Sequence, residues 1–465
     1  MGTNVLAEAD LERLETEFRG TVLRPDDPAY ESAREVWNGM IDERPAVITR
    51  PTGVADVRIA VDVAGDADVP IAVRGGGHGV AGTAVADDSL VVDLSGMASV
   101  FVNREEGTVR VQGGATWGDV DHETRPYGLV VPGGVVSTTG VAGLTLGGGY
   151  GWTRRKWGLT CDSLRSTEVV TADGDVVTAS ATEHEDLFWA LRGGGGNFGV
   201  VTSFEFDAHE LGPEVYLCGA LYPLDDGEAV LRAWREFAPD APEAVTVDAV
   251  LWSVPAEPTF PEDLHGEPFV GMMGMYAGPV EEGEKALAPM RELATPMLDM
   301  SGPMPYVAVQ SMLDAEFPNG DRYYWKSHYL PELDDEAIAT VVDYARERPS
   351  PRSTIPIRSR GGAIADVAPG ATAFGERTAP FLLSIDGTWS DPADDEENVE
   401  WVQSFWDAME PHSTGEEYAN FAMFDAEAER ASFGRNAERL AAVKARYDPQ
   451  NRFRHNANVR PSAAT

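Results

Sequence analysis

Lysine is scarce in this sequence, and the charge balance is strongly acidic. Only four of the 36 basic residues are lysines (Lys156, Lys285, Lys326 and Lys444), against 77 acidic residues, which leaves a formal net charge of −41. Such a surface repels nucleic acid and anionic membranes, which argues against either as a partner. Self-repulsion on this scale is tolerable where roughly molar salt screens it over about 3 Å. The composition therefore predicts a halophilic protein.

Cysteines and long apolar runs are also few. Cys161 and Cys218 cannot form a disulfide framework, and no stretch approaches 18 uninterrupted apolar residues. The segment from Met1 to Arg24 is polar and acidic and lacks the apolar core of a signal peptide. We therefore expect a soluble, cytoplasmic protein. A hydrophobic content of 43% and eleven tryptophans exclude a disordered acidic chain.

The chain of 465 residues is longer than one hydrophobic core usually serves, which predicts two lobes. Between about residues 46 and 206, short β-rich segments alternate with helices and glycine-rich loops, typical of an α+β lobe. From residue 211 to about 414, aromatic, methionine and proline residues separate acidic helices. We interpret that region as a second lobe, with a sheet that helices cover on one face. The expected strands include Thr108–Gln112, Phe269–Tyr276 and Phe381–Trp389.

Three glycine clusters mark the first lobe, at residues 75–82, 133–151 and 193–199. Glycine lets backbone approach a flat or charged ligand closely, and successive free N–H groups can hold a phosphate. Three such clusters in one lobe imply one large, extended ligand. A single histidine, His78, follows three glycines in the first cluster. By itself it would be interpreted as a surface histidine in a turn.

Taken together, five stretches resemble one family. They are Pro70 to Gly79, Val131 to Gly151, Asp186 to Thr202, Tyr418 to Phe421 and Leu440 to Asn458. In this order they resemble the berberine bridge enzyme-like family, a branch of the vanillyl-alcohol oxidase relatives with a PCMH-type FAD-binding lobe. The resemblance covers nearly the whole chain. It implies an FAD-binding domain over residues 1–210 with its core at about 42–210, a substrate domain over 211–414 on an antiparallel sheet, and a C-terminal element over 415–465 that returns to the FAD domain.

The resemblance also implies a set of FAD-binding residues. His78 matches the histidine that bonds to the 8α-methyl group of the flavin. Relatives often carry a second link from a cysteine, but Val136 stands at that position, so we expect one covalent bond only. Cys161 is better interpreted as a small buried residue. The other residues expected to contact FAD are Arg74, Gly75, Gly76, Gly77, Gly79, Gly133, Gly134, Thr138, Thr139, Gly140, Gly143, Gly148, Tyr150, Gly151, Val201, Asn420, Asn456 and Asn458.

Substrate oxidation requires a base that takes a proton as hydride leaves for the flavin. Tyr418 matches the family, but Phe421 stands where many relatives have a second tyrosine. Asp386 is a polar residue in an apolar strand: buried, it would have a raised pKa and could act as a base, whereas on an edge strand it would face solvent. Tyr324 and Lys326 are further candidates in the stretch from Tyr323 to His328.

No metal site is expected. His122 has carboxylates on either side, but the segment lacks metal-ligand spacing and a second histidine, which is typical of a surface helix. The resemblance implies an FAD-dependent oxidase that removes a hydride from a C–OH or C–N carbon and passes the electrons to O₂. The substrate would be a carbohydrate, alcohol, amine or phenolic compound. A dehydrogenase with another electron acceptor and a non-catalytic flavin-binding protein are the alternatives.

Overall fold

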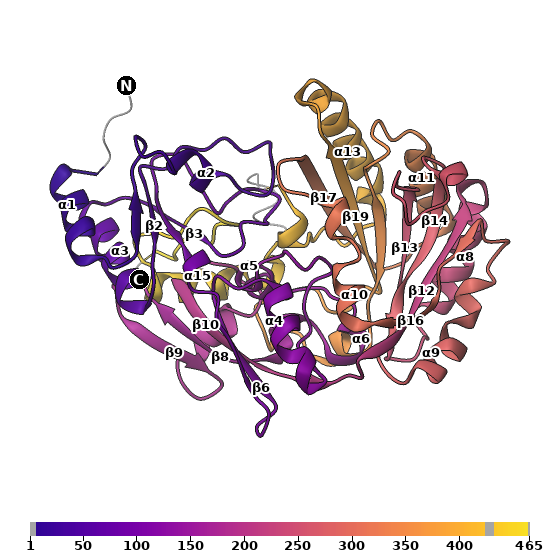
Figure 1. The fold of residues 1–465 in the computed structure, drawn as a ribbon, viewed down its shortest axis with the longest axis horizontal. Helices are drawn as coiled ribbons and strands as arrows, with labels where there is room; N and C mark the ends of the chain where they lie inside the picture. The colour runs from indigo at the N-terminus through magenta and orange to yellow at the C-terminus, as the bar shows by residue number, and fades with distance from the viewer. Residues whose placement is uncertain (1–5, 424–431, 464–465) are drawn as a thin grey trace.

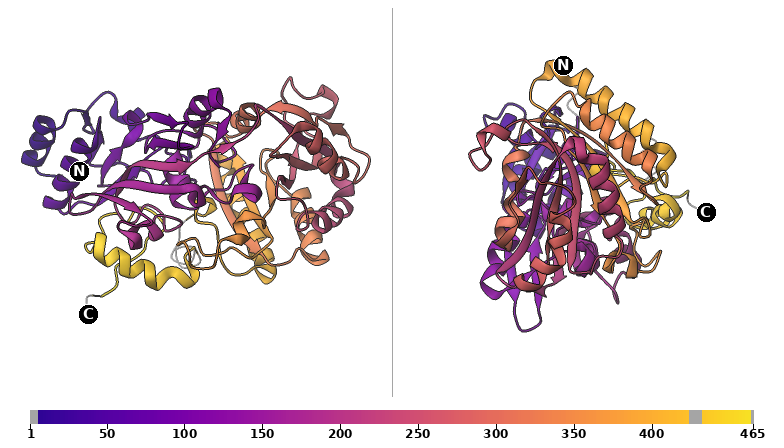
Figure 2. Two further views of the ribbon diagram at one scale, coloured as in Figure 1. Left: turned by 90° about the horizontal axis from the view of Figure 1, so that it is seen from below. Right: turned by 90° about the vertical axis from the view of Figure 1, so that its right-hand side faces the viewer.

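The computed structural model describes residues 6–423 and 432–463 and shows two halves side by side (Figure 1). The chain builds the left-hand half first, then the right-hand half, and its last segment returns to the first half. Figure 2 shows this return from below, with the C-terminal helix lying along the first half. The result is the α+β fold that the sequence predicts.

The first half contains two main sheets, joined by the glycine-rich loops. The smaller has the order β1-β2-β4-β3, in which β4 pairs in parallel with both β2 and β3. The larger is antiparallel, with the order β5-β6-β10-β8-β9. Their strands are β1 Thr21–Leu23, β2 Val47–Arg50, β3 Ile71–Arg74, β4 Leu90–Asp93, β5 Val100–Asn103, β6 Thr108–Gln112, β8 Leu164–Val170, β9 Val176–Ser180 and β10 Val200–Asp207, and a separate pair joins β7 Leu129–Val130 to β11 His209–Glu210.

The second half is built on an eight-stranded antiparallel sheet with the order β15-β12-β14-β13-β18-β19-β17, in which β16 also pairs with β12. Its strands are β12 Glu214–Pro223, β13 Val245–Ser253, β14 Pro268–Tyr276, β15 Leu298–Asp299, β16 Gly302–Pro305, β17 Arg322–Leu330, β18 Ile355–Ser359 and β19 Phe381–Trp389.

Helices cover one face of the eight-stranded sheet and bury the largest core. Alternate strand residues such as Ala249, Ile357 and Leu383 pack against α8, α9, α11 and α13. Their strand neighbours point to the opposite face, because successive side chains of a strand alternate. The helices are α1 Glu8–Glu17, α2 Tyr30–Arg34, α3 Val54–Asp66, α4 Trp117–Thr124, α5 Val141–Leu146, α6 Arg154–Trp157, α7 Glu185–Ala190, α8 Gly227–Phe237, α9 Val280–Leu287, α10 Tyr306–Ser311, α11 Asp335–Arg346, α12 Ala363–Asp366, α13 Asp395–Met409 and α15 Ala437–Tyr447.

A buried ion pair ties the returning C-terminal segment to the first half. Lys444 on α15 pairs with Asp448 at 2.7 Å, and both side chains are fully buried. The Lys444 ammonium also donates to the carbonyl oxygens of Asn197 (2.7 Å) and Phe453 (2.8 Å). A buried charge is stable only when it is paired and hydrogen-bonded in this way. The ion pair therefore joins the third glycine loop to the segment after α15.

Most expected elements are present, with shifted ends. The strand expected at Phe269–Tyr276 begins one residue earlier, at Pro268, and the strands Thr108–Gln112 and Phe381–Trp389 have the bounds expected. The division at residues 210 and 414 stays a prediction. Within the described part of the chain, no helix has the length and apolar character needed to cross a membrane. The cytoplasmic location also stays a prediction.

Candidate active site

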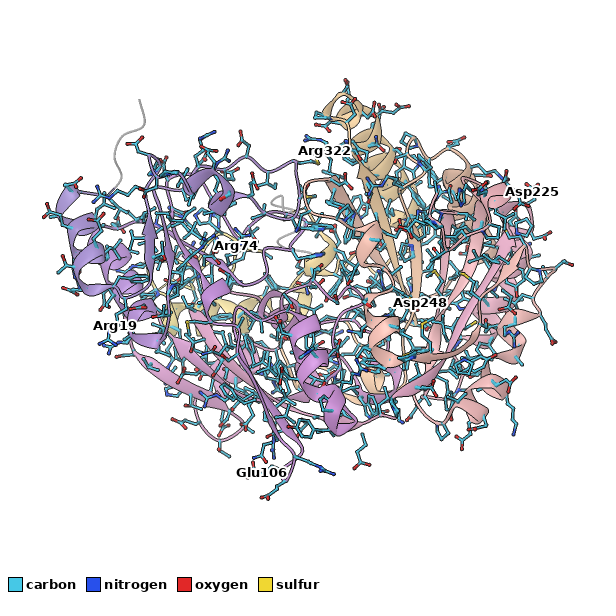
Figure 3. All side chains as sticks on the ribbon, viewed as in Figure 1. Arg19, Arg74, Glu106, Asp225, Asp248 and Arg322 are labelled. Carbon is cyan, nitrogen blue, oxygen red and sulfur yellow. The ribbon has the colours of Figure 1, made fainter. Side chains whose placement is uncertain are left out.

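A cavity with a volume of about 310 Å³ lies where the two halves meet. One wall comes from the glycine loops of the first half, and the other from the face of the eight-stranded sheet that the helices leave uncovered. The segments around Tyr418 and Asn456 close it. Figure 3 labels Arg74 on the first half and Asp248, which lines the cavity, on the second.

Many of the residues expected to bind FAD line this cavity. They are Gly75, Gly76, Gly77, His78, Gly79, Gly134, Thr139, Gly140, Gly143, Tyr150, Val201, Asn420 and Asn456. The three glycine clusters and the C-terminal segment, far apart in sequence, therefore contribute to one continuous surface.

At some positions the glycine loops pack so closely that a side chain cannot be accommodated. A Cβ atom at Gly76 would lie 2.6 Å from both Cα and N of Gly140. Backbone therefore meets backbone at the cavity wall, and N–H groups rather than side chains face the ligand. This cradle fits the flat ring and diphosphate of FAD.

Some expected contact residues do not line the cavity, and packing explains several of them. A Cβ at Gly151 would lie 2.0 Å from the carbonyl oxygen of Gly133, so this pair lets two loop segments touch. Gly148 has a φ of +117°, a backbone conformation that favours glycine, so its role is in the path of the loop. The Arg74 side chain donates to the Ala33 carbonyl at 2.8 Å, away from the cavity. Thr138 and Asn458 are the other two residues that do not line the cavity.

His78 is held by aromatic stacking. Its ring lies 4.3 Å from that of Trp37 at an angle of 15°, and Trp37 stacks in turn on Tyr323 of β17 at 3.5 Å. Burial lowers the pKa of His78 to about 4, so the imidazole is neutral at physiological pH. Its Nε2 is buried and has no hydrogen-bond partner among the described residues. The structure thus presents a neutral, fixed imidazole at the cavity wall.

Asn197 anchors the C-terminal segment at the far end of the cavity. Its side-chain amide donates to the carbonyl oxygens of Gly194 (2.8 Å) and Ala457 (2.9 Å). The side-chain oxygen Oδ1 of Asn197 accepts from the backbone N–H of Val459 at 2.9 Å. The third glycine loop and the segment containing Asn456 are therefore locked together where both line the cavity.

Asp386 lies on the cavity face of an interior strand. β19 pairs with β18 on one side and β17 on the other, so the edge-strand alternative is wrong. Asp386 is only 1% exposed and accepts hydrogen bonds from the hydroxyls of Ser384 and Thr354, the latter at 3.4 Å. Burial raises its pKa to about 6. A carboxylate of this kind is suited to accept a proton near neutral pH.

Tyr418 also lines the cavity, and its hydroxyl oxygen accepts two hydrogen bonds. The backbone N–H of Gly149 donates to it at 3.0 Å and the Asn420 amide at 2.8 Å. Burial raises the pKa of Tyr418 well above its usual range, so the phenol keeps its proton. Tyr418 can donate a hydrogen bond but is unsuited to act as a base.

The structure does not bring Tyr324 and Lys326 to the cavity. Both lie on β17, where the intervening Trp325 lines the cavity instead. The Tyr324 hydroxyl accepts from Gln403 of α13 at 3.0 Å, and the Lys326 ammonium lies 3.8 Å from the Trp406 ring centre on the same helix. The two-residue alternation of the strand points both side chains toward the helix layer, so neither is placed to act on a substrate.

Sequence reasoning missed the charged residues on neighbouring strands. Asp248 of β13 and Arg358 of β18 line the cavity beside Asp386. Asp248 accepts from the buried guanidinium of Arg154 and from the backbone N–H of Ser359 at 3.0 Å. The signal was available, because Asp248 is a lone charge within the apolar run of residues 245–252, as Asp386 is in its strand.

Metal-ligating side chains are dispersed in the part of the chain that the structure describes. No three His, Cys, Asp or Glu side chains there lie together in a way that could hold a metal ion. His122 is exposed on α4 and contacts Glu123 of the same helix at 3.0 Å. Cys161 and Cys218 are both buried and free, and neither lines the cavity.

Comparisons with known proteins agree with this geometry. A family model described as FAD binding domain matches residues 45–180, and one described as berberine and berberine like matches residues 417–460. The FAD-linked oxidoreductase YgaK of Bacillus subtilis is 31% identical over 96% of this chain and 98% of its own. Glucooligosaccharide oxidase of Sarocladium strictum is 30% identical over 98% and 94%. The crystal structure of 6-hydroxy-D-nicotine oxidase from Arthrobacter nicotinovorans superposes with a TM-score of 0.83 at 27% identity, covering 96% of this chain and 98% of that one.

Fold, cavity and relatives together define an FAD-dependent oxidoreductase. The chain belongs to the berberine bridge enzyme-like family of FAD-linked oxidoreductases.

Proposed function

We propose that this enzyme is an oxidase that removes a hydride from a C–OH or C–N carbon of a small organic substrate. The observation that carries the proposal is one continuous cavity with His78 and the glycine loops on one wall and Asp386 on the other. When bound, FAD would supply the hydride acceptor, and O₂ would take the electrons and leave as H₂O₂. The relatives named above act on an oligosaccharide and on a hydroxylated nicotine, which supports a carbohydrate, alcohol, amine or phenolic substrate.

Asp386 is the proposed base. It would take the proton from the substrate O–H or N–H as hydride leaves the adjacent carbon, so that the product is a carbonyl or an imine. Its burial, its raised pKa and its place on the cavity wall support this role. Tyr418 would donate a hydrogen bond and hold the substrate in place.

An anaerobic screen tests the reaction. The purified holoenzyme is mixed with sugars, alcohols, amines and phenolic alcohols, and loss of flavin absorbance is followed. Bleaching by one class and recovery on admitting air, with one H₂O₂ per turnover, is expected of an oxidase. Recovery only with an artificial acceptor would identify a dehydrogenase, and no bleaching by any class would contradict catalysis.

A single covalent bond through His78 is proposed for the cofactor. The neutral imidazole, its unpartnered Nε2 and its rigid stacking on Trp37 support the bond. Val136 lines the cavity where a thiol would be needed for a second bond. After acid precipitation the flavin should stay with the protein pellet, and His78→Ala should release it to the supernatant. Flavin that leaves the unaltered protein on acid treatment would disprove the bond but not FAD binding.

Halophilic adaptation is proposed from the net charge of −41. Carboxylates that repel one another in dilute buffer are screened at molar salt, so the folded state should gain stability there. The melting temperature of the holoenzyme should rise steeply between 0.1 and 3 M KCl. A flat profile would contradict the proposal.

A further inference from the structure

Arg358 is a buried cation that takes part in no ion pair or side-chain hydrogen bond within the described residues. It lies on β18, is 7% exposed, and lines the cavity beside Asp386. Its Nη1 is buried without a hydrogen-bond partner, and no ion pair joins its guanidinium to any residue of the described ranges 6–423 and 432–463. Burying a charge in this state is costly, so the arrangement requires an explanation.

The other buried arginines between the halves do have partners. Arg154 pairs with Asp248, and Arg377 makes a two-pronged contact to Asp162 at 2.7 and 2.8 Å. Arg360 donates to the Tyr150 hydroxyl at 2.8 Å and to two carbonyl oxygens. Arg358 therefore differs from arginines that only hold the halves together.

The two carboxylates in the cavity are already engaged. Asp248 accepts from Arg154 and from the Ser359 backbone, and Asp386 accepts from two hydroxyls. Arg358 is near enough to lower the pKa of Asp386 through its charge, but no hydrogen bond joins them. The donors of Arg358 are thus left for a group that enters the cavity.

Phe421 packs against the guanidinium of Arg358. The Arg358 guanidinium carbon lies 4.6 Å from the centre of the Phe421 ring, a cation–π contact. Phe421 has no hydroxyl with which to accept from the guanidinium. A planar guanidinium that packs on a ring and has unused donors is suited to bind a carboxylate in two-pronged geometry.

We propose that Arg358 binds an anionic group of the substrate, so that the enzyme oxidises organic acids whose C–OH or C–N carbon lies near a carboxylate. The inference rests on the proposed function and refines its substrate class. Arg358 is then a specificity-determining residue, while Asp386 remains the base. The negative exterior does not prevent entry of an acid at molar salt, where charges are screened within a few ångströms.

Binding of non-oxidised probes tests the proposal directly. Benzoate and acetate are titrated into the oxidised holoenzyme at constant molar ionic strength and compared with the neutral amides benzamide and acetamide. The carboxylates should perturb the flavin spectrum and bind at least about tenfold more weakly to Arg358→Gln, the loss expected for a hydrogen-bonded charged pair. Amide binding should not change, and Arg346→Gln, at an exposed site on α11, should behave as the unaltered enzyme.

Arg358→Lys separates charge from geometry. It should retain part of the carboxylate affinity, because the cation remains but the two-pronged contact is lost. Carboxylates and amides that bind equally well, no carboxylate binding at all, or unchanged carboxylate binding by Arg358→Gln would each overturn the proposal.

Thermal unfolding supplies a second readout that does not need flavin absorbance. Benzoate should raise the melting temperature of the unaltered protein more than benzamide does, and this difference should vanish in Arg358→Gln. Without ligand, Arg358→Gln loses the cation–π contact with Phe421 and the charge near Asp386, so the melting temperature of each variant without benzoate is its own reference. A lower melting temperature with unchanged benzoate binding would identify a purely structural arginine. A protein that contains no flavin but shows the benzoate shift would contradict the proposed function while leaving the anion site intact.

Discussion

The two walls of the cavity are built in different ways. The wall from the first half is backbone: glycines bring loops within contact distance, and a Cβ atom at Gly76 would meet Gly140 at 2.6 Å. The wall from the eight-stranded sheet is made of side chains, with Asp248, Arg358 and Asp386 contributed by three adjacent strands. Where two loops meet in this way, the backbone wall tolerates no added atoms. A side-chain wall can change its chemistry without a change of fold.

This difference assigns the two tasks of the enzyme to separate structures. In the proposed function, FAD would contact the wall where added atoms disrupt the packing of the loops. The substrate would contact the wall where each strand can exchange one side chain while its neighbours keep the helix-facing core intact. Substitutions on the two walls should therefore have different effects. Those on the backbone wall should reduce FAD binding, and those on the side-chain wall should reduce kcat.

Asp386→Asn should have the largest effect on activity. Removal of a positioned base lowers kcat by about 10²- to 10⁴-fold. The amide keeps the shape: its oxygen can accept from the Ser384 hydroxyl, and its nitrogen can donate to the hydroxyl oxygen of Thr354. Flavin content should not change. Stopped-flow measurement of flavin reduction by the substrate found in the screen checks this. A variant that loses FAD as well would break the distinction between the walls.

The raised pKa of Asp386 also predicts how kcat and folding stability change with pH. The pKa of Asp386 is raised to about 6, so kcat should fall as pH drops through 6 and the base is protonated. Its raised pKa favours the neutral form in the folded state, so its stability contribution is lost as pH rises through 6. Asp386→Asn should therefore be more stable than the unaltered enzyme above pH 6, by about 3 kcal/mol, and equally stable near pH 4.

Asp121 offers a matched control for that experiment. It is buried on α4, does not line the cavity, and has a pKa raised to about 7 by burial. Asp121→Asn should also gain stability above pH 7, with no change in kcat. Loss of activity in Asp121→Asn would indicate that Asp386→Asn acts through stability rather than proton transfer.

Gly76→Ala should have the next largest effect, which is a loss of bound FAD. The new methyl group must displace the backbone at Gly140, which costs about 1–3 kcal/mol of folding free energy and opens the cradle. Gly79→Ala, in the same loop, meets no protein atom within 4 Å. Flavin content per chain and melting temperature should fall in Gly76→Ala, and the melting temperature should hold in Gly79→Ala. Equal melting temperatures for the two variants would contradict the backbone-wall account.

Tyr418→Phe should have an intermediate effect, because Tyr418 lies where the two walls meet. Loss of its oxygen leaves the buried N–H of Gly149 without an acceptor, which costs about 1–3 kcal/mol. Because the phenol is not the base, kcat should fall by no more than about tenfold. Melting curves and steady-state kinetics measure both. Tyr344→Phe, whose hydroxyl is near the surface on α11, is the control and should change neither; a loss of kcat as large as that of Asp386→Asn would restore Tyr418 as base.

The sequence predicted the first wall better than the second for a physical reason. Backbone cradles require glycine at fixed places, and runs of glycine are visible in a sequence. The strands of the second wall are buried on both faces, so apolar and polar residues do not alternate along them. The sequence therefore does not show which residues of a strand point toward the cavity. Tyr324 and Lys326 were therefore placed in the site, whereas Trp325 lines it and Arg358 was missed. Asp386 was found because a lone charge in an apolar strand is itself a signal.

Lys326→Met should have the smallest effect and tests the facing of β17. Lys326 lies over the Trp406 ring on the helix side of the sheet, 8% exposed, so its loss removes a cation–π contact and costs about 0.5–2 kcal/mol of stability. It reaches no substrate, so kcat should stay within about twofold. Stopped-flow flavin reduction and melting curves, with the exposed Lys285→Met as control, check both values. A large loss of flavin reduction with a normal melting temperature would mean that the strand presents its other face to the cavity during turnover.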